Sequence, residues 1–192
     1  AEPQAETSAP KHPKTCDVSF ENVTFAYENT DHPAVSHLSF TAKAGTTTAL
    51  VGHSGSGKST TASLIPRFYD VQQGAVKIGG VDIREIPHAD LMKMVAFVFQ
   101  DPKLFKDTLL ENIRAGRPSA TRDEVLQAAR LAQCDDILEK FPDGLDTVVG
   151  SKGVYLSGGE TQRIAIARAI LKDAPIVVLD EATAYADPEN EQ

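Results

Sequence analysis

Gly52-His53-Ser54-Gly55-Ser56-Gly57-Lys58-Ser59 is the stretch from which the fold of this chain can be argued. Its three glycines adopt backbone angles that other residues resist, so successive N–H groups can turn inward around phosphate groups. Lys58 adds a mobile positive charge for β- and γ-phosphates, and the hydroxyl of Ser59 is placed to bind Mg2+. The stretch predicts a loop, here called the phosphate loop, that holds ATP or GTP.

The residues around the phosphate loop favour a strand before it and a helix after it. Thr46 to Val51 is a short β-branched and apolar run that ends at Gly52, and Lys58 to Arg67 can continue as a helix. A strand, a glycine-rich loop and a helix in this order form the context in which such a loop binds phosphate. An exposed glycine-rich turn is the weaker interpretation, because the spacing is complete.

The N-terminal region changes character near residue 16. Residues 1–15 contain three prolines and almost no large apolar side chain, so we expect a tether that does not gain enough from burial to become ordered. Apolar residues then alternate with polar ones, which predicts an antiparallel sheet at the start of the domain. The positions that carry this pattern are Val18, Phe20, Val23 and Phe25, followed by Val35, Leu38 and Phe40.

A pair of carboxylates follows the last apolar run of the chain. Ile176 to Leu179 is short and β-branched, as expected of a strand buried on both faces of a parallel sheet, and Asp180 and Glu181 come directly after it. Ligands of open α/β sheets bind at the carboxyl ends of the strands. We expect Asp180 to hold the Mg2+ shell and Glu181 to orient or deprotonate the attacking water.

Composition narrows the class of protein. The chain has 192 residues, 41% of them hydrophobic, which is enough for one globular domain with its own core. A net charge of −8 and the absence of a basic cluster argue against a nucleic-acid partner. No apolar run approaches the roughly 18 to 20 residues that cross a bilayer. Cys16 and Cys134 are far apart and are expected to be free thiols in a reducing compartment.

A second motif supplies a family resemblance. Leu156-Ser157-Gly158-Gly159-Glu160-Thr161-Gln162 precedes an Ala-rich helical run, and Ser157 can cap that helix. This segment resembles the signature helix of ATP-binding cassette (ABC) transporter nucleotide-binding domains, and the resemblance extends from about Cys16 to the last residue. It implies an α/β P-loop NTPase (RecA-like) core with an antiparallel β subdomain and an ABC helical subdomain at about 101–172. Residues 1–15 would then be a flexible linker from a preceding membrane domain, and 16–192 the ATP-binding domain.

The resemblance also assigns roles to single positions. Tyr27 matches the aromatic residue that stacks on adenine, and Gln100 matches the glutamine that senses Mg2+ and the γ-phosphate. Asp187 matches an aspartate that crosses to a partner subunit, although Ala184-Tyr185-Ala186 precedes it where many relatives have Ser-Ala-Leu. The expected catalytic residues are Lys58, Gln100 and Glu181; the Mg2+ ligands are Ser59, Gln100 and Asp180; and the nucleotide contacts are Tyr27, Gly52, His53, Ser54, Gly55, Ser56, Gly57, Lys58, Ser59, Thr60, Ser157, Gly158, Gly159 and Glu160.

Three further segments point to a subfamily. Asp101 to Ile113 is similar to the segment of exporter-fold ABC transporters that faces the membrane domain, and Asp146 to Gly153 resembles the loop before their signature, with Ser151 where a glutamate is usual. The ending from Asp180 to Glu191 looks like that of bacterial exporters linked to siderophores and iron. Thr121 to Ala132 is predicted as an amphipathic helix of the helical subdomain.

The resemblance implies partners and a location. The phosphate loop and the signature of one subunit belong to different sites, so a second nucleotide-binding domain, identical or not, must complete each site. We expect ATP and Mg2+ to bind, ATP-dependent dimerisation to drive membrane domains, and the chain to lie at the cytoplasmic face of the inner membrane, soluble as an isolated domain. No histidine follows Glu181 where the family has one near the γ-phosphate, so we expect a truncated piece that is weak or inactive alone.

Two other function classes stay open at this point. A soluble ABC ATPase of DNA repair or translation would share the phosphate loop, the signature and the carboxylates, but would typically add basic stripes or long coiled coils. A nucleotide-binding regulatory domain without turnover is the other alternative, and the presence of Glu181 argues against it.

Overall fold

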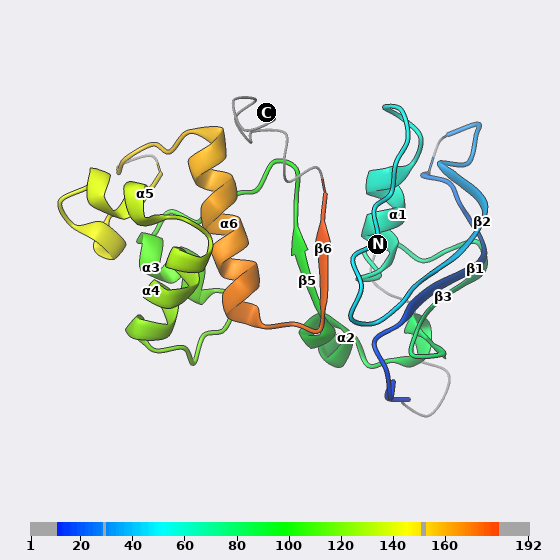
Figure 1. Cartoon of the computed structure of the whole chain (residues 1–192). Helices are drawn as coiled ribbons and strands as arrows, with labels where there is room; N and C mark the ends of the chain where they lie inside the picture. The colour runs from blue at the N-terminus through cyan, green and yellow to red at the C-terminus, as the bar shows by residue number, and fades with distance from the viewer. Residues whose placement is uncertain (1–10, 29, 151–152, 181–192) are drawn as a thin grey trace. The chain divides into compact units, whose positions relative to one another are not determined.

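The structure, a computed structural model, describes residues 11–28, 30–150 and 153–180 of the chain. The chain divides into an N-terminal unit, Ala1–Val95, and a C-terminal unit, Ala96–Gln192. Figure 1 traces the elements in chain order. The expected limits of the linker, the ATP-binding domain and the helical subdomain remain predictions.

The N-terminal unit contains an antiparallel sheet, as predicted. Its strands lie in the order β2-β1-β3-β4. The bounds are β1 Val18–Phe25, β2 Val35–Ala42, β3 Gln73–Ile78 and β4 Val81–Asp82. The alternating side chains of β1 are buried, and Phe20 stacks on Phe40 of β2 with ring centroids 4.7 Å apart. The pattern steps by three residues from Phe20 to Val23, because the register of β1 shifts between these positions and Asn22 has a φ of 49°.

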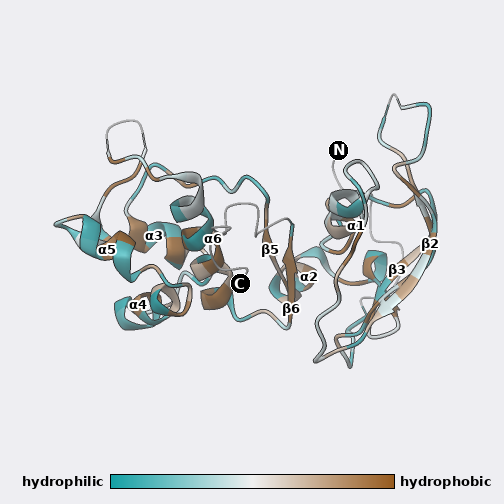
Figure 2. Ribbon diagram, turned by 45° about the horizontal axis from the view of Figure 1, so that its top comes forward, coloured by the Kyte–Doolittle hydropathy of each residue, from teal (hydrophilic) through white to brown (hydrophobic). Residues whose placement is uncertain are grey.

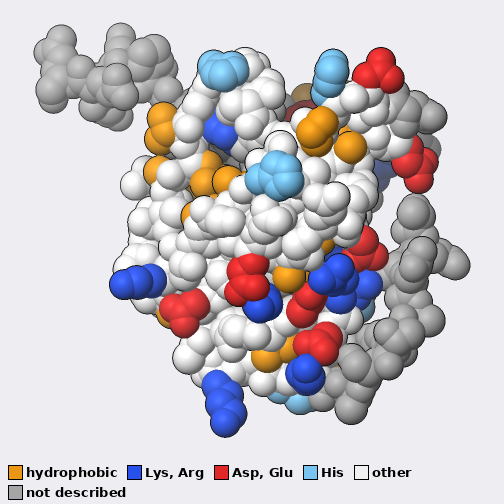
Figure 3. All heavy atoms as spheres, turned by 90° about the vertical axis from the view of Figure 1, so that its right-hand side faces the viewer, with side chains coloured by type: hydrophobic (Ala, Val, Ile, Leu, Met, Phe, Trp, Pro, Cys, Tyr) orange, Lys and Arg blue, Asp and Glu red, His pale blue; other side chains and the backbone are white. Residues whose placement is uncertain are grey.

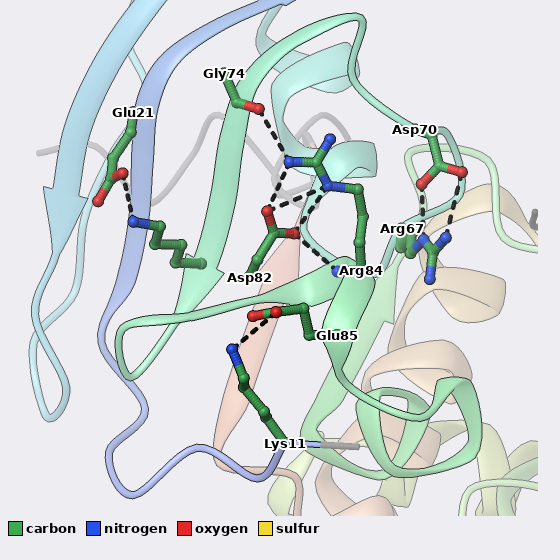
Figure 4. Close-up of polar contacts among 9 residues, drawn as sticks. Lys11, Glu21, Arg67, Asp70, Gly74, Asp82, Arg84 and Glu85 are labelled. Carbon is green, nitrogen blue, oxygen red and sulfur yellow. Dashed lines mark hydrogen bonds and ion pairs between the residues drawn. The ribbon is translucent and has the colours of Figure 1, made fainter. Parts of the chain in front are cut away.

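Short helices and ion pairs complete this unit. The helices are α1 Lys58–Leu64, the 3-10 helix η1 Ile83–Glu85 and α2 His88–Met94. Figure 4 shows Arg84 donating to Asp82 at 2.6 Å and to the carbonyl of Gly74 at 3.2 Å, which ties η1 to the start of β3. Lys11 reaches Glu85 through its ammonium at 2.8 Å and through its backbone N–H at 3.0 Å. Residue 11 of the expected tether therefore contacts the unit.

Acidic and basic side chains lie next to one another on the face of the N-terminal unit seen in Figure 3. One such pair joins neighbouring strands, since Lys77 of β3 lies 2.6 Å from Glu21 of β1. A face of paired opposite charges is unlike the single-sign stripe that binds a phosphate backbone. The absence of a nucleic-acid partner stays a prediction from the composition.

The predicted strand at Thr46–Val51 is wrong. The backbone of these residues has no strand assignment, and Val51 is 93% exposed. A strand exists only through ladder hydrogen bonds with a neighbour, and the bond observed at the start of this run is a local one from the N–H of Thr46 to the carbonyl of Lys43. β-branched composition alone therefore did not produce a strand.

Helices dominate the C-terminal unit. They are α3 Leu109–Arg114, α4 Arg122–Leu131, α5 Asp135–Lys140, the 3-10 helix η2 Gly144–Asp146, and α6 Gly158–Lys172. Apolar faces of α3, α4 and α5 pack with α6 around a common core that includes Ile113, Ile137 and Ile164. The predicted amphipathic helix is confirmed as α4, capped by Thr121, with Val125 and other apolar residues on its buried face.

Two strands, β5 Val95–Val98 and β6 Ile176–Leu179, pair beside α6 and run in the same direction (Figure 1). Both are hydrophobic along their length (Figure 2). Burial of β6 on both faces was expected and is wrong, because Ile176 and Val178 are buried whereas Val177 and Leu179 are 55% and 56% exposed. Burial on both faces needs a layer on each, and the packing observed for this pair is made by α6 against β5 on one face.

The start of α6 confirms the predicted cap. The hydroxyl of Ser157 accepts from the backbone N–H of Glu160 at 3.2 Å, and the Glu160 carboxylate accepts from the N–H of Ser157 at 2.7 Å. This reciprocal capping box satisfies two backbone donors that a helix start otherwise leaves open. Lys140 of α5 donates to the same carboxylate at 2.7 Å. The Lys140 hydrogen bond and the Ser157 N–H together lower the pKa of Glu160.

Both cysteines are free thiols, as expected. Cys134 is buried before α5, and burial raises the pKa of its thiol to about 11. Among the described helices, none is both long enough and apolar enough to cross a bilayer.

Substitution of two glycines should separate backbone strain from steric overlap. Gly74 and Gly80 have φ near +78° and +79°, but a Cβ at Gly74 would lie 2.3 Å from the carbonyl oxygen of Glu21, whereas one at Gly80 would meet nothing within 4 Å. We expect Gly80→Ala to lower the free energy of unfolding by about 1–2 kcal/mol through left-handed strain. Gly74→Ala should cost about 1–3 kcal/mol more, because β3 must move away from β1. Urea denaturation measures both, and equal losses would contradict the overlap.

Acidification should weaken the cap of α6. Because the folded pKa of Glu160 is lowered from 4.5, its contribution to stability is complete above that value and is lost as the pH falls through the folded pKa. Glu160→Gln should therefore flatten the fall in urea midpoint between about pH 6 and about pH 3. Glu139→Gln, on the exposed surface of α5, is the matched control and should keep the steeper fall. The same slope in both variants would argue against the stabilising role of the ionised Glu160.

Candidate nucleotide site

The phosphate loop leads directly into α1, and glycine is required where they join. Gly57 has a φ of 85° and is the N-cap of α1. A Cβ at this position would lie 2.3 Å from the carbonyl oxygen of Ala34, the residue before β2. Gly55 also has a positive φ of 80°, with open space around it. The loop thus combines left-handed backbone with close packing on the sheet, which no other residue type at 57 would allow.

Lys58 folds back over the phosphate loop. Its ammonium donates to the carbonyl of Gly52 at 2.9 Å and to that of His53 at 3.0 Å. Residues 52–56 and Ser59 are exposed, and a hollow of about 350 Å³ that Ser56 and Lys58 help to line adjoins the loop. The ammonium is therefore held at the loop by weak neutral acceptors, which an anionic phosphate oxygen can replace with a charge-assisted hydrogen bond.

Tyr27 is joined to α1 although it comes from the end of the sheet. Its hydroxyl lies 3.0 Å from the hydroxyl of Thr60, and Phe25 and Tyr69 meet its ring edge-on with centroids 5.0 Å and 5.3 Å away. The Tyr27 side chain stays 38% exposed. Thr60, expected among the nucleotide contacts, is buried and holds this aromatic ring. The ring is thus fixed relative to the phosphate loop with part of its surface open.

Gln100 and Asp180 lie at the same edge of the β5–β6 pair. The backbone N–H of Asp180 donates to the carbonyl of Val98 at 2.9 Å, so the end of β6 is aligned with the end of β5, two residues before Gln100. This agrees with the expectation that the carboxylate follows the end of a strand. Glu181 and Asp187 lie outside the described residues.

The signature segment forms the exposed start of α6. Ser157 and Gly158 are exposed, and Glu160 is engaged by both Ser157 and Lys140. The carboxylate of Glu160 therefore already serves the helix cap. Ser157 and the two glycines present the surface that a second molecule could approach.

The donor set suits a nucleotide with Mg2+. Hydroxyl, amide and carboxylate oxygens, which Ser59, Gln100 and Asp180 provide, are the ligand types that Mg2+ takes. The ammonium of Lys58 and the glycine-rich backbone suit phosphate oxygens. Ser59 lies in the N-terminal unit, and Gln100 and Asp180 lie in the C-terminal unit. Their shared role as ligands remains a prediction.

Sequence reasoning missed several residues that organise these segments. Asn112 is fully buried in α3, Arg168 of α6 donates to it, and Lys140 neutralises Glu160. An asparagine between Leu110 and Ile113 on an apolar helix face was the available signal, because a buried amide must find partners. The other two depend on contacts between distant segments, which a single sequence does not show.

Comparisons with known proteins agree with the motifs. The family described as ABC transporter matches residues 35–184. The ATP-dependent lipid A-core flippase of Escherichia coli (strain K12) is 51% identical over 179 residues, 93% of this chain and 31% of that protein. The protein of the same name from Shigella flexneri gives the same values. A solved structure of a bacterial Atm1-family ABC exporter with ATP bound matches with a TM-score of 0.89 and 42% identity, over 97% of this chain and 32% of that one.

The chain spans about a third of the length of these relatives. The family match covers most of the chain and includes both the phosphate loop and the signature segment. The similarity to the exporter structure extends over nearly the whole chain, so it concerns the fold as well as the motifs. The chain therefore belongs to the ABC transporter family, as an ATPase domain.

Proposed function

We propose that the chain binds and hydrolyses ATP to power an exporter-fold ABC transporter. The observation that carries this proposal is the occurrence in one chain of a glycine-dependent phosphate loop at α1 and a capped, solvent-facing signature at α6. The relatives support the exporter class, since one is named as a flippase and the other as an exporter. The similarity covers only the part of each relative that matches this chain. Transport itself is therefore a proposal.

The proposed chemistry is phosphoryl transfer to water. Lys58 would exchange its bonds to the Gly52 and His53 carbonyls for bonds to the β- and γ-phosphates, and the loop N–H groups would hold the phosphates from behind. Glu181 would orient or deprotonate the attacking water. Bound Mg2+, with Ser59, Gln100 and Asp180 as its proposed ligands, would supply positive charge that stabilises the phosphates during transfer.

A second ATPase domain is part of the proposal. Ser157 and Gly158 are exposed and Gly159 is half-buried at the start of α6, where they would meet the γ-phosphate of a nucleotide held by a partner domain. Closure of two domains on ATP and their separation after hydrolysis would move transmembrane domains. In this working cycle the chain would lie at the cytoplasmic face of the membrane.

We propose two classes of cargo. The ending from Asp180 to Glu191 resembles exporters of siderophores and iron, whereas the curated relatives are named for lipid A-core. A transport assay with the full-length protein in vesicles should test both classes. The soluble repair or translation ATPase is disfavoured, because the relatives reported above are named as flippases or exporters.

Two substitutions should separate binding from turnover. Lys58→Ala should abolish ATP binding, because the loop loses its only mobile charge, and Glu181→Gln should keep binding while lowering turnover by about 10²–10⁴-fold. Binding of a fluorescent ATP analogue and phosphate release by the full-length protein measure the two effects. Lys93→Ala, an exposed lysine of α2, is the control and should match the unmodified protein. Unchanged phosphate release in both test variants would exclude the mechanism.

Tyr27 should act on the base and not on the phosphates. Tyr27→Phe keeps the ring and loses the bond to Thr60, whereas Tyr27→Ala removes the ring. Stacking contributes about 1–3 kcal/mol per base, so Tyr27→Ala should weaken ATP binding by about 5–150-fold and Tyr27→Phe by much less. Competition with inorganic tripolyphosphate, which has no base, should be similar for both variants. A parallel loss of tripolyphosphate binding would show that the loop itself was damaged.

A further inference from the structure

Arg168 makes an unusual set of contacts for a half-buried arginine. Its Nε donates to the backbone carbonyl of Asn112 at 2.8 Å, and its guanidinium carbon lies 5.3 Å from the centre of the Phe105 ring. Among the described residues, no carboxylate forms an ion pair with it. A second nitrogen of the guanidinium donates to Oδ1 of Asn112 at 3.4 Å. The charge is therefore stabilised by two neutral oxygens of Asn112 and by an aromatic face, which makes the ring contact a principal partner of the guanidinium.

Asn112 fixes the backbone that carries this ring. Its Oδ1 accepts from the N–H of Phe105 at 2.7 Å, and its Nδ2 donates to the carbonyl of Phe105 at 3.0 Å and to that of Thr108 at 2.9 Å. A primary amide carries an acceptor oxygen and a donor nitrogen side by side, so it can pair with both the N–H and the C=O of one residue. Phe105, Asn112 and Arg168 together are here called the Phe105 clamp.

The Phe105 clamp is partly exposed to solvent. Phe105 is 59% exposed, and with Phe97, Phe99 and Arg168 it borders a hollow of about 550 Å³. A large aromatic side chain held rigidly from behind and exposed in front is suited to contact a partner surface, because little rotamer entropy remains to be lost on binding.

α6 joins the clamp to the signature segment. Ser157 caps the helix and Arg168 lies eleven residues later, about 16 Å along an uninterrupted helix. The backbone carbonyl of Arg168 also lies against Gly116, where an added Cβ would be 2.2 Å from that oxygen. The end of α3 therefore cannot stay in place if α6 shifts at this point.

We propose that Arg168 is a positioning residue that carries movement of the signature helix to Phe105. The inference rests on the proposed function, in which the start of α6 meets the nucleotide of a partner domain. A shift of α6 moves the guanidinium, and the guanidinium moves the ring that lies on it. During such a shift, the hydrogen bonds of Asn112 hold the segment from Phe105 to Thr108 in one conformation.

A single tryptophan can report on the ring, because the chain contains none. Phe105→Trp places that reporter in the clamp, and it is combined with Arg168→Lys or with the control Arg130→Lys on the exposed face of α4. Lysine keeps the charge but cannot form the planar contact and the Nε bond at once. Acrylamide quenching of the tryptophan without nucleotide should rise about two-fold with Arg168→Lys and stay unchanged with Arg130→Lys.

Addition of ATP with Mg2+ then tests transmission in the full-length protein, in which any tryptophan outside these 192 residues is first replaced by phenylalanine. The emission of the Phe105→Trp variant should shift on nucleotide binding, and Arg168→Lys should remove most of that shift while the affinity for a fluorescent ATP analogue stays within about two-fold. If Arg168 had only a structural role, Arg168→Lys would lower the stability of the fold but would not remove the emission shift while leaving the affinity for ATP unchanged. An equal shift with and without Arg168, or no shift although ATP binds, would overturn the inference and leave the proposed function intact. Failure of ATP to bind any variant would instead overturn the proposed function and the inference with it.

A second pair of variants covers the case in which Arg168→Lys does not fold. Ala115→Trp places the reporter on the exposed end of α3, beside the hollow that Phe105 borders. This reporter is then combined with Phe105→Leu, which removes the aromatic face from an exposed position. The emission shift on nucleotide binding should be mostly lost in the double variant, compared with Ala115→Trp alone. A response that persists without the aromatic ring would overturn the inference.

Discussion

The close approach of Gly57 to Ala34 is the constraint on which the N-terminal unit depends. Because residue 57 has no Cβ, α1 can begin against the first residues of β2, and Thr61 fixes this start by donating its N–H and its hydroxyl to the Gly57 carbonyl, each at 2.8 Å. The same helix then carries Lys58 on its first turn and Thr60 toward Tyr27. One missing methyl group thus determines where the phosphate loop, the ammonium and the aromatic ring lie relative to the sheet.

The C-terminal unit depends on α6 in a comparable way. The helix packs against α3 and α4, carries the signature at its start and holds Phe105 through Arg168 near its end. A carboxylate at the start of such a helix would repel an approaching phosphate, but Glu160 is tied to the cap and paired with Lys140. The pair leaves little net charge at the position where, in the proposed dimer, the exposed Ser157 and Gly158 would face the γ-phosphate.

Local chemistry explains which parts of the fold could be predicted. The alternation of Val18 to Phe25, the Ser-x-x-Glu spacing of Ser157 and Glu160, and the glycine at 57 each describe contacts within a few residues or one repeated face. The strand expected at Thr46–Val51 failed because a strand needs a partner that its own sequence does not name. Burial of β6 on both faces failed for the same reason, since it depends on a second covering layer. Asn112 was overlooked because its partners are defined by the folded turn at Phe105.

The acidic composition of the chain and its polyanionic ligand are compatible because electrostatic effects here are local. A net charge of −8 would oppose ATP if it acted as a whole, but salt screens exposed charges beyond about 8 Å. In the proposed site the phosphates would meet the ammonium of Lys58 and the loop N–H groups, and several acidic side chains of the described residues, Glu21 and Asp82 among them, are held in ion pairs. Asp180 is proposed as a Mg2+ ligand, and a carboxylate placed near phosphates would need a cation between them. If Asp180 shares the nucleotide site as proposed, the charges of that site would by themselves call for Mg2+, independently of the family to which the chain belongs.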